Sequence, residues 1–400
     1  MSIIIGITAF IASNGFASWQ GPIEVISSTW GSNAGQIGIA YGDIEDDFAR
    51  SFGVSQSGNI VIADSINEVL HIFNSNGDFQ RDIKNTFAWR GWPGDVLVKS
   101  ECAVVNYVQF TQTFNVLTGT LIGKADNMGG ADYVSDDCLN IYLGGSSGWK
   151  IYSPTGQIIK TLVTKPLELG VVRSSSKQAD GSRQTVISYN DATYSINSPK
   201  MLEYFTRNTS GYIYGVIITG PGVNQYYRVY KYNKCGKALG YVDLPANNIV
   251  VAPNTTMPPK PTPDVNVIAE YGKPVIAPNG DVYCWERTDE QYKILKWIWQ
   301  DNPNVQTGPD APTGLTLMPS TSGLYLTWTA SVQDPGCVSG YEISRVTTSG
   351  GVGSTVATLN AGVVKYNDTT VTVGTTYFYK IRAVAGGEYS PYTAEVSEKK

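Results

Sequence analysis

Histidine is nearly absent from this chain, and its scarcity excludes several kinds of catalytic and metal site. His71 is the only imidazole among 400 residues. A Ser-His-Asp site needs a histidine beside its nucleophile, and a histidine-rich zinc site needs several histidines. Because His71 stands alone within the apolar stretch Val69–Phe73, we expect it to have a structural role, and we expect no catalytic residues of these kinds.

Charge is also scarce, and its balance is acidic. Charged residues make up 16% of the chain, the formal net charge is −5, and no run of five like charges occurs. Nucleic-acid binding needs a basic surface, so we expect no nucleic-acid partner. The glycine-rich stretches 144–148 and 349–354 lack the lysine of a phosphate-binding loop and are typical of hairpin turns.

Cysteine is limited to five residues, and none stands in a CxxC or CxxCH motif or beside a histidine. Covalent haem and a Cys/His zinc site are therefore excluded. An odd number leaves at least one thiol free or in an intermolecular bond. Cys102 and Cys138 each precede an apolar strand in neighbouring units, and we predict that they form a disulfide.

The longest apolar run of the N-terminus is too short to cross a bilayer. Ile3–Ala12 is about ten residues long, whereas a spanning helix needs about 20. Gly15 and Ala17 place small residues at −3 and −1 of a cleavage site, so residues 1–17 are predicted to be a signal peptide. The mature protein is then secreted, extracellular or periplasmic and cell-envelope associated, without a transmembrane segment. The alternatives are a buried strand or a retained anchor, because the segment lacks Lys and Arg.

What the chain does have is the composition of an all-β protein with many turns. It contains 42 glycines and 25 tyrosines, and 42% of its residues are hydrophobic. Residues 42–79 form the clearest unit, in which Ser51–Val54, Ile60–Ala63, Val69–Phe73 and a run from Phe79 alternate with Gly/Asn/Asp turns. One sheet cannot bury both of its faces, so this unit implies neighbours of the same kind.

Similar turns recur at a regular spacing after aromatic-rich strands. They occupy residues 74–78, 153–157 and 233–237, and their glycines lie 79 and 80 residues apart. Two units of about 40 residues fit each interval, which is the blade length of a β-propeller. We therefore predict a six-bladed β-propeller over residues 22–300, in which residues 22–49 supply a closing strand or part of a seventh blade.

Within that region, two expectations concern individual segments. A strand is expected across Phe114–Leu121, in the second unit. The proline-dense segment Pro253–Pro263 is incompatible with a strand or helix, so we expect a long loop there, between the last two blades.

The last quarter of the chain has a different pattern. Residues 301–309 are predicted to be a linker, because they belong to a proline-containing polar stretch. Residues 310–400 contain seven short alternating strands, with Trp328 on the second and Tyr341 on the third. This pattern predicts an immunoglobulin-like β-sandwich of about 90 residues.

Both parts resemble known families. Residues 42–79 resemble an NHL repeat through FGV, GNIVIADSINEVLHIFN and NGDF, although the usual Asn-His pair is Asn67-Glu68 here. This resemblance implies a six-bladed propeller. NHL-like amidating lyases use zinc-bound histidines, and one histidine cannot build such a site.

The last 90 residues resemble a fibronectin type III domain, in which Tyr377 takes the place of the corner tyrosine. The residues that carry this second resemblance are Pro312, Leu315, Trp328, Tyr341, Ile343, Arg345 and 374–384.

Trp89, Arg90 and Trp92 are the candidate binding residues. They lie in the expected loop 87–93 between the first two blades. Two tryptophans and an arginine on a loop face can stack on a sugar ring or anchor a protein partner. The alternative is that both tryptophans pack between blades, because tryptophan is usually largely buried.

An acidic cluster is the candidate metal site. Asp43, Glu45, Asp46 and Asp47 supply the several oxygen ligands that calcium prefers, but without EF-hand spacing. The alternative is a solvated loop, and no cofactor other than calcium is suggested. A second acidic set is no more specific, and consists of Asp126, Asp132, Asp136 and Asp137.

These observations favour an exported, non-catalytic binding or scaffolding protein. Its partner would be a protein or a polysaccharide, recognised by the loop face of the propeller. A second hypothesis is a carbohydrate- or lactone-active enzyme with a carboxylate or calcium site on the propeller axis. A third is a subunit of a larger cell-envelope or extracellular assembly, with the free cysteine and exposed aromatic residues in an interface.

Overall fold

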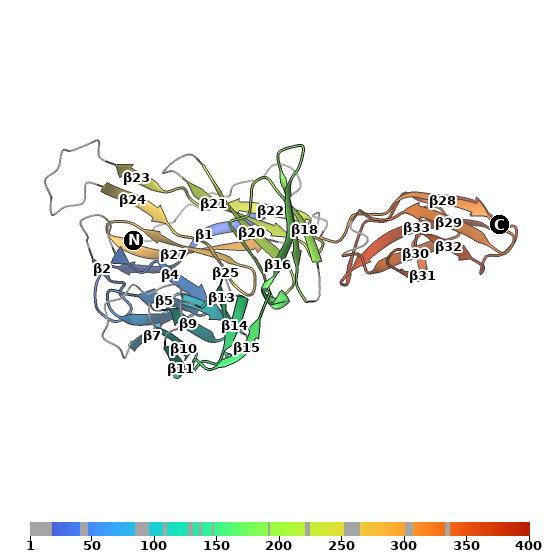
Figure 1. The fold of residues 1–400 in the computed structure, drawn as a ribbon. Coiled ribbons are helices and arrows are strands. Elements are labelled where there is room, and N and C mark those ends of the chain that lie inside the picture. The colour runs from blue at the N-terminus through green and yellow to red at the C-terminus, as the bar shows by residue number, and fades with distance from the viewer. Residues whose placement is uncertain are drawn as a thin grey trace.

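The fold is all-β in every part of the chain that the computed structural model describes (Figure 1). Its only helical element there is the 3-10 turn η1 (Leu167–Leu169). Within the described residues, no helix is long and apolar enough to cross a membrane. The described ranges are 18–40, 47–84, 96–106, 110–126, 131–135, 138–145, 148–190, 193–220, 225–251, 265–300, 307–332 and 337–400.

The first sheet is the unit that the sequence marks most clearly. Four antiparallel strands follow one another in chain order, and the expected strands agree with them closely. Every residue of the second strand is buried, because the sheet packs against a neighbour on each face. The four strands are β4 (Ser51–Val54), β5 (Ile60–Asp64), β6 (Val69–Phe73) and β7 (Phe79–Lys84).

Two further four-stranded sheets follow. The expected strand across Phe114–Leu121 is wrong, because the chain turns there: Asn115 accepts from the backbone nitrogens of Thr118 and Gly119. Gly119 has a φ of 75°, which glycine adopts without strain. The strands are β8 (Val96–Lys99), β9 (Cys102–Asn106), β10 (Phe110–Asn115) and β11 (Leu121–Asp126), then β12 (Tyr133–Val134), β13 (Ile141–Gly145), β14 (Gly148–Tyr152) and β15 (Ile158–Leu162).

The fourth sheet has only three strands, whereas the sheets before and after it have four. After its third strand the chain passes directly into the next sheet. The three strands are β16 (Val171–Lys177), β17 (Arg183–Ser188) and β18 (Thr193–Ser198). The next sheet contains β19 (Tyr204–Arg207), β20 (Ile213–Thr219), β21 (Tyr226–Tyr232) and β22 (Ala238–Asp243).

The sixth sheet joins the two ends of this region. Its outermost strand comes from the N-terminal side and pairs antiparallel with β27, with Trp19 opposite Trp299. The expected loop Pro253–Pro263 lies outside the described residues, and the strands on either side of it, β23 and β24, pair with one another. The strands are β1 (Ser18–Thr29), β23 (Asn248–Val251), β24 (Val265–Tyr271), β25 (Val275–Ile276), β26 (Val282–Arg287) and β27 (Gln291–Gln300). A separate pair, β2 (Ile39–Ala40) and β3 (Asp47–Phe48), follows β1.

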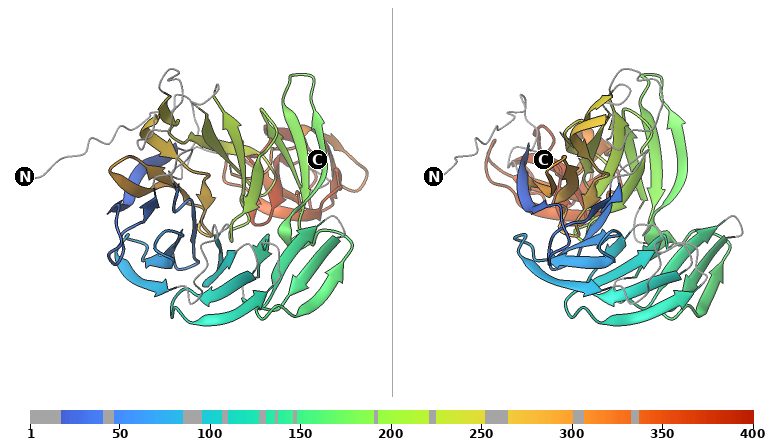
Figure 2. Two further views of the ribbon diagram at one scale, coloured as in Figure 1. Left: turned by 60° about the vertical axis from the view of Figure 1, so that its left-hand side comes forward. Right: turned by 90° about the vertical axis from the view of Figure 1, so that its left-hand side faces the viewer.

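Most neighbouring sheets share apolar cores, and Figure 2 shows the sheets following one another in a curved succession. Ile62 of the first sheet packs in one cluster with Trp285 of the sixth, and Val61 packs in another with Val105 of the second. The fifth sheet shares a cluster with the fourth and another with the sixth. No sheet closes on itself in the described ranges, so the six-bladed propeller stays a prediction.

The C-terminal region is a fibronectin type III-like sandwich of two antiparallel sheets. Its core contains Trp328, Tyr341 and Tyr379. Tyr377 is buried and its hydroxyl accepts from the Thr372 nitrogen at 3.0 Å, which is the arrangement of a tyrosine corner. One sheet contains β28 (Thr313–Pro319), β29 (Leu324–Thr329) and β32 (Lys365–Asp368), and the other contains β30 (Gly340–Val346), β31 (Ser354–Asn360), β33 (Thr376–Ala385), β34 (Glu388–Tyr389) and β35 (Val396–Lys399).

Candidate functional site

Most of the site residues expected from sequence lie outside the described residues. These are the binding residues Trp89, Arg90 and Trp92 and the acidic residues Asp43, Glu45 and Asp46. The fourth acidic residue, Asp47, is in β3, where its backbone pairs with Ala40. Among the residues that the structure describes, no group of three His, Cys, Asp or Glu side chains is arranged to hold a metal ion.

The second acidic set is divided between separate interactions. Asp126 forms an ion pair with Lys124 at 2.9 Å, at the end of β11. Asp132 accepts from the backbone nitrogen of Gly144 at 2.6 Å. Asp136 and Asp137 lie outside the described ranges. The two described carboxylates therefore have structural partners of their own.

His71 lies in a buried ionic network of the first sheet. Its side chain is 1% exposed, with Nδ1 at 2.6 Å from Asp82 and Nε2 at 3.0 Å from Asp64. Asp64 also accepts from the backbone nitrogens of Gly38 and Asn67. This network fixes the turn after β5, and its burial keeps His71 out of contact with any substrate.

Two opposing effects set the protonation of this pair. Burial lowers the pKa of His71, but its hydrogen bonds to the two aspartates and their negative charges raise that pKa above its ordinary value. Burial raises the pKa of Asp64, but the bonds from His71, Asn67 and Gly38 lower it below its ordinary value. Both shifts favour the charged forms of His71 and Asp64 over their neutral forms.

The cysteines form two disulfides. Cys102 is bonded to Cys138, which ties the second sheet to the third. Cys235 is bonded to Cys337, which ties the fifth sheet to the sandwich. Cys284 is free and fully buried, and its burial raises the pKa of the thiol. The expectation that the free cysteine lies in an interface between subunits is therefore wrong.

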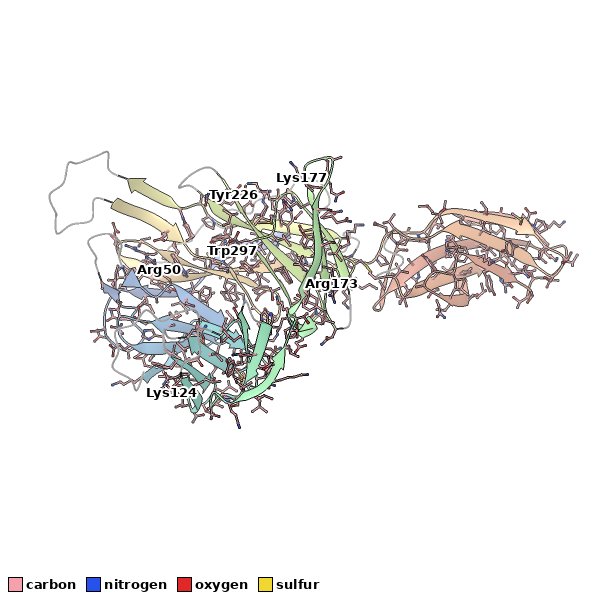
Figure 3. All side chains as sticks on the ribbon, in the orientation of Figure 1. Arg50, Lys124, Arg173, Lys177, Tyr226 and Trp297 are labelled. Atoms are coloured by element: carbon pink, nitrogen blue, oxygen red, sulfur yellow. A yellow bond between two sulfur atoms is a disulfide. The ribbon has the colours of Figure 1, made fainter. Side chains whose placement is uncertain are left out.

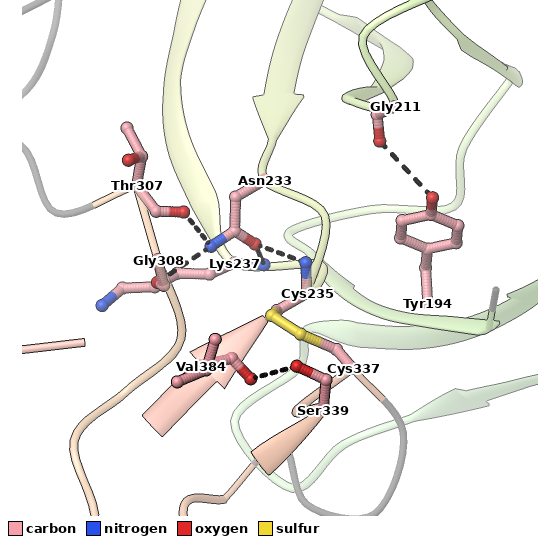
Figure 4. The surroundings of a disulfide bond; sticks show 10 residues. All are labelled: Tyr194, Gly211, Asn233, Cys235, Lys237, Thr307, Gly308, Cys337, Ser339 and Val384. Carbon is pink, nitrogen blue, oxygen red and sulfur yellow. Dashed lines mark hydrogen bonds between the residues drawn. A yellow bond between two sulfur atoms is a disulfide. The ribbon is translucent and has the colours of Figure 1, made fainter. Parts of the chain in front are cut away.

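The Cys235–Cys337 bond is the centre of a junction between the two domains (Figure 4). Cys235 lies in the turn between β21 and β22. In the same turn, the Asn233 amide nitrogen donates to the carbonyls of Thr307 and Gly308, at 2.8 and 3.1 Å. The Asn233 amide oxygen accepts from the turn's own backbone nitrogens, so one buried side chain holds both the turn and the connecting segment.

Two further contacts extend the junction. Lys237 forms an ion pair with Asp310 at 2.7 Å. Tyr212, just before β20, donates to Glu388 at 3.0 Å, which fixes the β33–β34 end of the sandwich. The sequence had marked residues 233–237 only as a repeated turn. The one available signal was its cysteine, which the equivalent turns at 74–78 and 153–157 lack.

The three-stranded sheet presents an unusually exposed strand. In β16, six of seven residues are exposed. The first strands of the first three sheets lie close to one another, through contacts of β4 with β8 and of β8 with β12, and β4 also contacts β25 of the sixth sheet. Across the described ranges, no comparable contact joins β16 to β12 or β19. The succession of sheets is therefore loosest on the approach to β16.

Where the structure describes them, the third and fourth sheets are joined by polar and aromatic contacts of the segment before β16 and not by a shared apolar core. Glu168 accepts from Tyr142 at 3.2 Å and from Asn190 at 3.5 Å, so it links the third sheet to the fourth. The Lys165 ammonium lies 5.8 Å from the ring of Trp149, and burial lowers its pKa despite the nearby charge of Asp132. Glu168 and Asn190 are exposed, whereas Tyr142 is buried.

Comparison with known proteins gives structural likeness only. No family model matches the chain, and no curated protein sequence matches it. A Fn3-like protein from Clostridium thermocellum is 37% identical and aligns over 22% of this chain and 90% of its own, with a TM-score of 0.20. The FN3 domain of human collagen XX is 21% identical over 25% and 99%, with a TM-score of 0.21. A two-domain fibronectin type III segment from chicken tenascin is 13% identical over 46% and 97%, with a TM-score of 0.25. The two-sheet architecture of the C-terminal sandwich is therefore assigned from its strand pairing.

Proposed function

We propose that this chain is an exported, non-catalytic binding or scaffolding protein in which the six-sheet region recognises a protein or polysaccharide. The sandwich is a rigid spacer that holds this region in a set direction. The observation that carries the proposal is the domain junction, where a disulfide, an ion pair and side-chain hydrogen bonds from two places fix the sandwich. An enzyme with independent domains has no need of such a connection.

We further propose that the six sheets are the blades of an NHL-like propeller. Shared apolar cores between consecutive sheets, other than the third and fourth, support this arrangement. The pairing of β1 with β27 supports it as well, because it joins the N-terminal strand to the last sheet as ring closure requires.

Export is supported by the two disulfides. Disulfides persist in oxidising compartments and are rare in the cytosol. Cys102 and Cys138 are 36 residues apart, and Cys235 and Cys337 are 102 apart, so both bonds constrain long stretches of chain. This argument and the predicted signal peptide support the proposed secreted or cell-envelope location.

Thermal unfolding of the oxidised full chain with a ligand panel tests the binding role. The panel contains neutral, uronic-acid and amino-sugar polysaccharides together with acidic, basic and neutral peptides. A ligand that binds only the folded state raises Tm in a concentration-dependent way. We expect at least one saturable shift, and no reducing ends or lactone-derived acid above the uncatalysed rate.

Two results overturn the proposal. One is turnover of a polysaccharide or lactone that disappears in a carboxylate variant, because this establishes the enzyme hypothesis. The other is free movement of the domains in small-angle X-ray scattering of the oxidised protein. Scattering of a Cys235→Ser, Cys337→Ser variant is the matched control, and it should show the wider distribution of interdomain distances.

A further inference from the structure

The fourth sheet has three strands, and β16 is one of its two edges. β4, β8, β12 and β19 are also edges of their sheets, but β16 differs because six of its seven residues are exposed. The sheet ends on one side at β18 and on the other at β16. The described residues pair β16 with β17 alone. A strand with an unpaired edge leaves half of its backbone N–H and C=O groups without a partner strand.

The other edge of the sheet is already occupied in part. Gly236 lies so close to β18 that a Cβ there would be 2.3 Å from the Ser195 carbonyl oxygen. The Tyr232 hydroxyl donates to the Asn197 carbonyl at 3.3 Å. The turn and strand of the fifth sheet therefore cover β18, whereas β16 extends into solvent over most of its length.

The side chains around β16 are basic. Arg173 and Lys177 lie on the strand and Arg183 lies opposite Lys177, whereas the only acidic residue of the hairpin is Asp180 (Figure 3). Neither Arg173 nor Lys177 has an acidic partner in the described part of the chain. In a protein with a net charge of −5, this strand is a local positive surface.

We propose that the free edge of β16 is a docking site for an extended acidic segment of a partner protein, which adds to the sheet as its fourth strand. Backbone hydrogen bonds to residues 171–177 supply the affinity, and Glu or Asp side chains beside Arg173 and Lys177 select the segment. The inference rests on the proposed binding role and names the kind of partner.

The geometry suits such a segment. Seven residues of strand extend for roughly 23 Å, which is long enough for an added strand of ordinary length. Ser174, Ser175 and Ser176 in the middle of β16 are small and exposed, so they leave a partner backbone room to approach. Exposed lysine and arginine also discourage uncontrolled pairing of edge strands, so the same charges would reject neutral or basic segments.

The test uses the oxidised full chain and a nine-residue fluorescein-labelled peptide of alternating threonine and glutamate with both ends blocked. Binding is followed by fluorescence anisotropy at low and high salt. We expect saturable binding that weakens with salt, and at least tenfold weaker binding in the double variant Arg173→Glu, Lys177→Glu. The matched control is Lys84→Glu, Lys160→Glu, on the exposed strands β7 and β15, and it should leave binding within twofold.

Two peptide controls separate strand addition from charge attraction. Replacing the central threonine by proline removes a backbone donor and breaks the strand, and it should weaken binding at least tenfold. Replacing the glutamates of the peptide by lysines should abolish binding, because the strand is basic. Hydrogen exchange of the complex should slow at residues 171–177 and remain unchanged in β7 and β15.

The inference is overturned if the acidic peptide does not bind or if the proline peptide binds equally well. It is also overturned if the complex slows hydrogen exchange at residues other than 171–177. If another ligand of the panel binds while this peptide fails, the proposed binding role stands without the inference. If turnover is found or the domain junction is flexible, the proposed function fails by its own test. Circular dichroism of each variant establishes that a loss of binding is not a loss of folding.

Discussion

The first and fourth sheets are both antiparallel, yet they differ in the burial of their strands and in the number of strands. In the first, β5 is wholly buried and a charged network of Asp64, His71 and Asp82 fixes the turn beside it. In the fourth, β16 is almost wholly exposed and one strand fewer is present. Burial and the charged network stabilise the first sheet, whereas β16 of the fourth sheet has backbone N–H and C=O groups that an added strand can bind.

Removing the centre of the buried network should have the largest effect. Asp64→Ala leaves His71 without one of its carboxylates and leaves the backbone nitrogens of Gly38 and Asn67 without their acceptor. Breaking a buried charged pair costs about 3–5 kcal/mol. Urea unfolding should show a loss of this size. Glu168→Ala, an exposed carboxylate beside the fourth sheet, is the control and should cost less than about 1 kcal/mol. Equal losses of unfolding free energy in the two variants would contradict the expected difference in stability between the first and fourth sheets.

The disulfide between the second and third sheets should come next. The double variant Cys102→Ala, Cys138→Ala releases a loop of 36 residues, and removal of such a bond typically costs about 2–4 kcal/mol. Denaturant unfolding in oxidising buffer measures the loss. In reducing buffer, where both disulfides of the wild type are open, the wild type and the variant should unfold at similar midpoints. An unchanged midpoint would mean that packing alone holds these two sheets together.

The pH dependence of the first sheet follows from its charged pair. Because the pKa of His71 is raised in the folded state, its stabilisation is complete below the unfolded value of about 6.5 and is lost as pH rises through the folded pKa. Because the pKa of Asp64 is lowered, its stabilisation is present above 3.8 and is lost as pH falls through the folded pKa. The unfolding free energy should therefore decline as pH rises from 6 to 9.

His71→Gln is the control for this dependence, because it keeps a polar side chain without a titrating group. Its unfolding free energy should be flatter between pH 6 and 9 than that of the wild type. The same decline in both proteins would assign the dependence to other groups.

Substitution on β16 should have the smallest effect. Arg173→Ala removes an exposed side chain without a charged partner, and such changes usually alter stability by less than about 0.5 kcal/mol. In the free protein, amides of residues 171–177 should exchange far faster than those of Ile60–Asp64. Slow exchange along β16 without a ligand would mean that its edge is already covered.

The parts of the fold that could be predicted were those with local signals. The strands of the first sheet follow from apolar runs bounded by Gly/Asn turns, and Trp328 and Tyr341 mark the sandwich strands correctly. A closing strand from residues 22–49 was one of two alternatives, the other being part of a seventh blade, and in the structure β1 pairs with β27 of the last sheet. The segment 114–121 was misread because Asn115 and Gly119 form a turn inside an apolar stretch.

The junction and the open strand had weaker signals. Asn233 bonds to carbonyls about seventy residues away along the chain, and no local pattern indicates such a partner. The absence of a fourth strand after β18 had a signal in the repeat itself, because no comparable glycine turn occurs there and Pro199 leads directly toward β19. The regular spacing of the other turns concealed that absence.

The Cys235–Cys337 bond also determines how the molecule carries mechanical load. A pull on the C-terminal end of the sandwich reaches Cys337 and passes through the covalent bond into the β21–β22 turn. The covalent bond therefore gives force a second path between the domains, in addition to the chain that connects them. If the partner is fixed and the sandwich is anchored, force enters the six-sheet region at its fifth sheet, beside the sheet that carries β16.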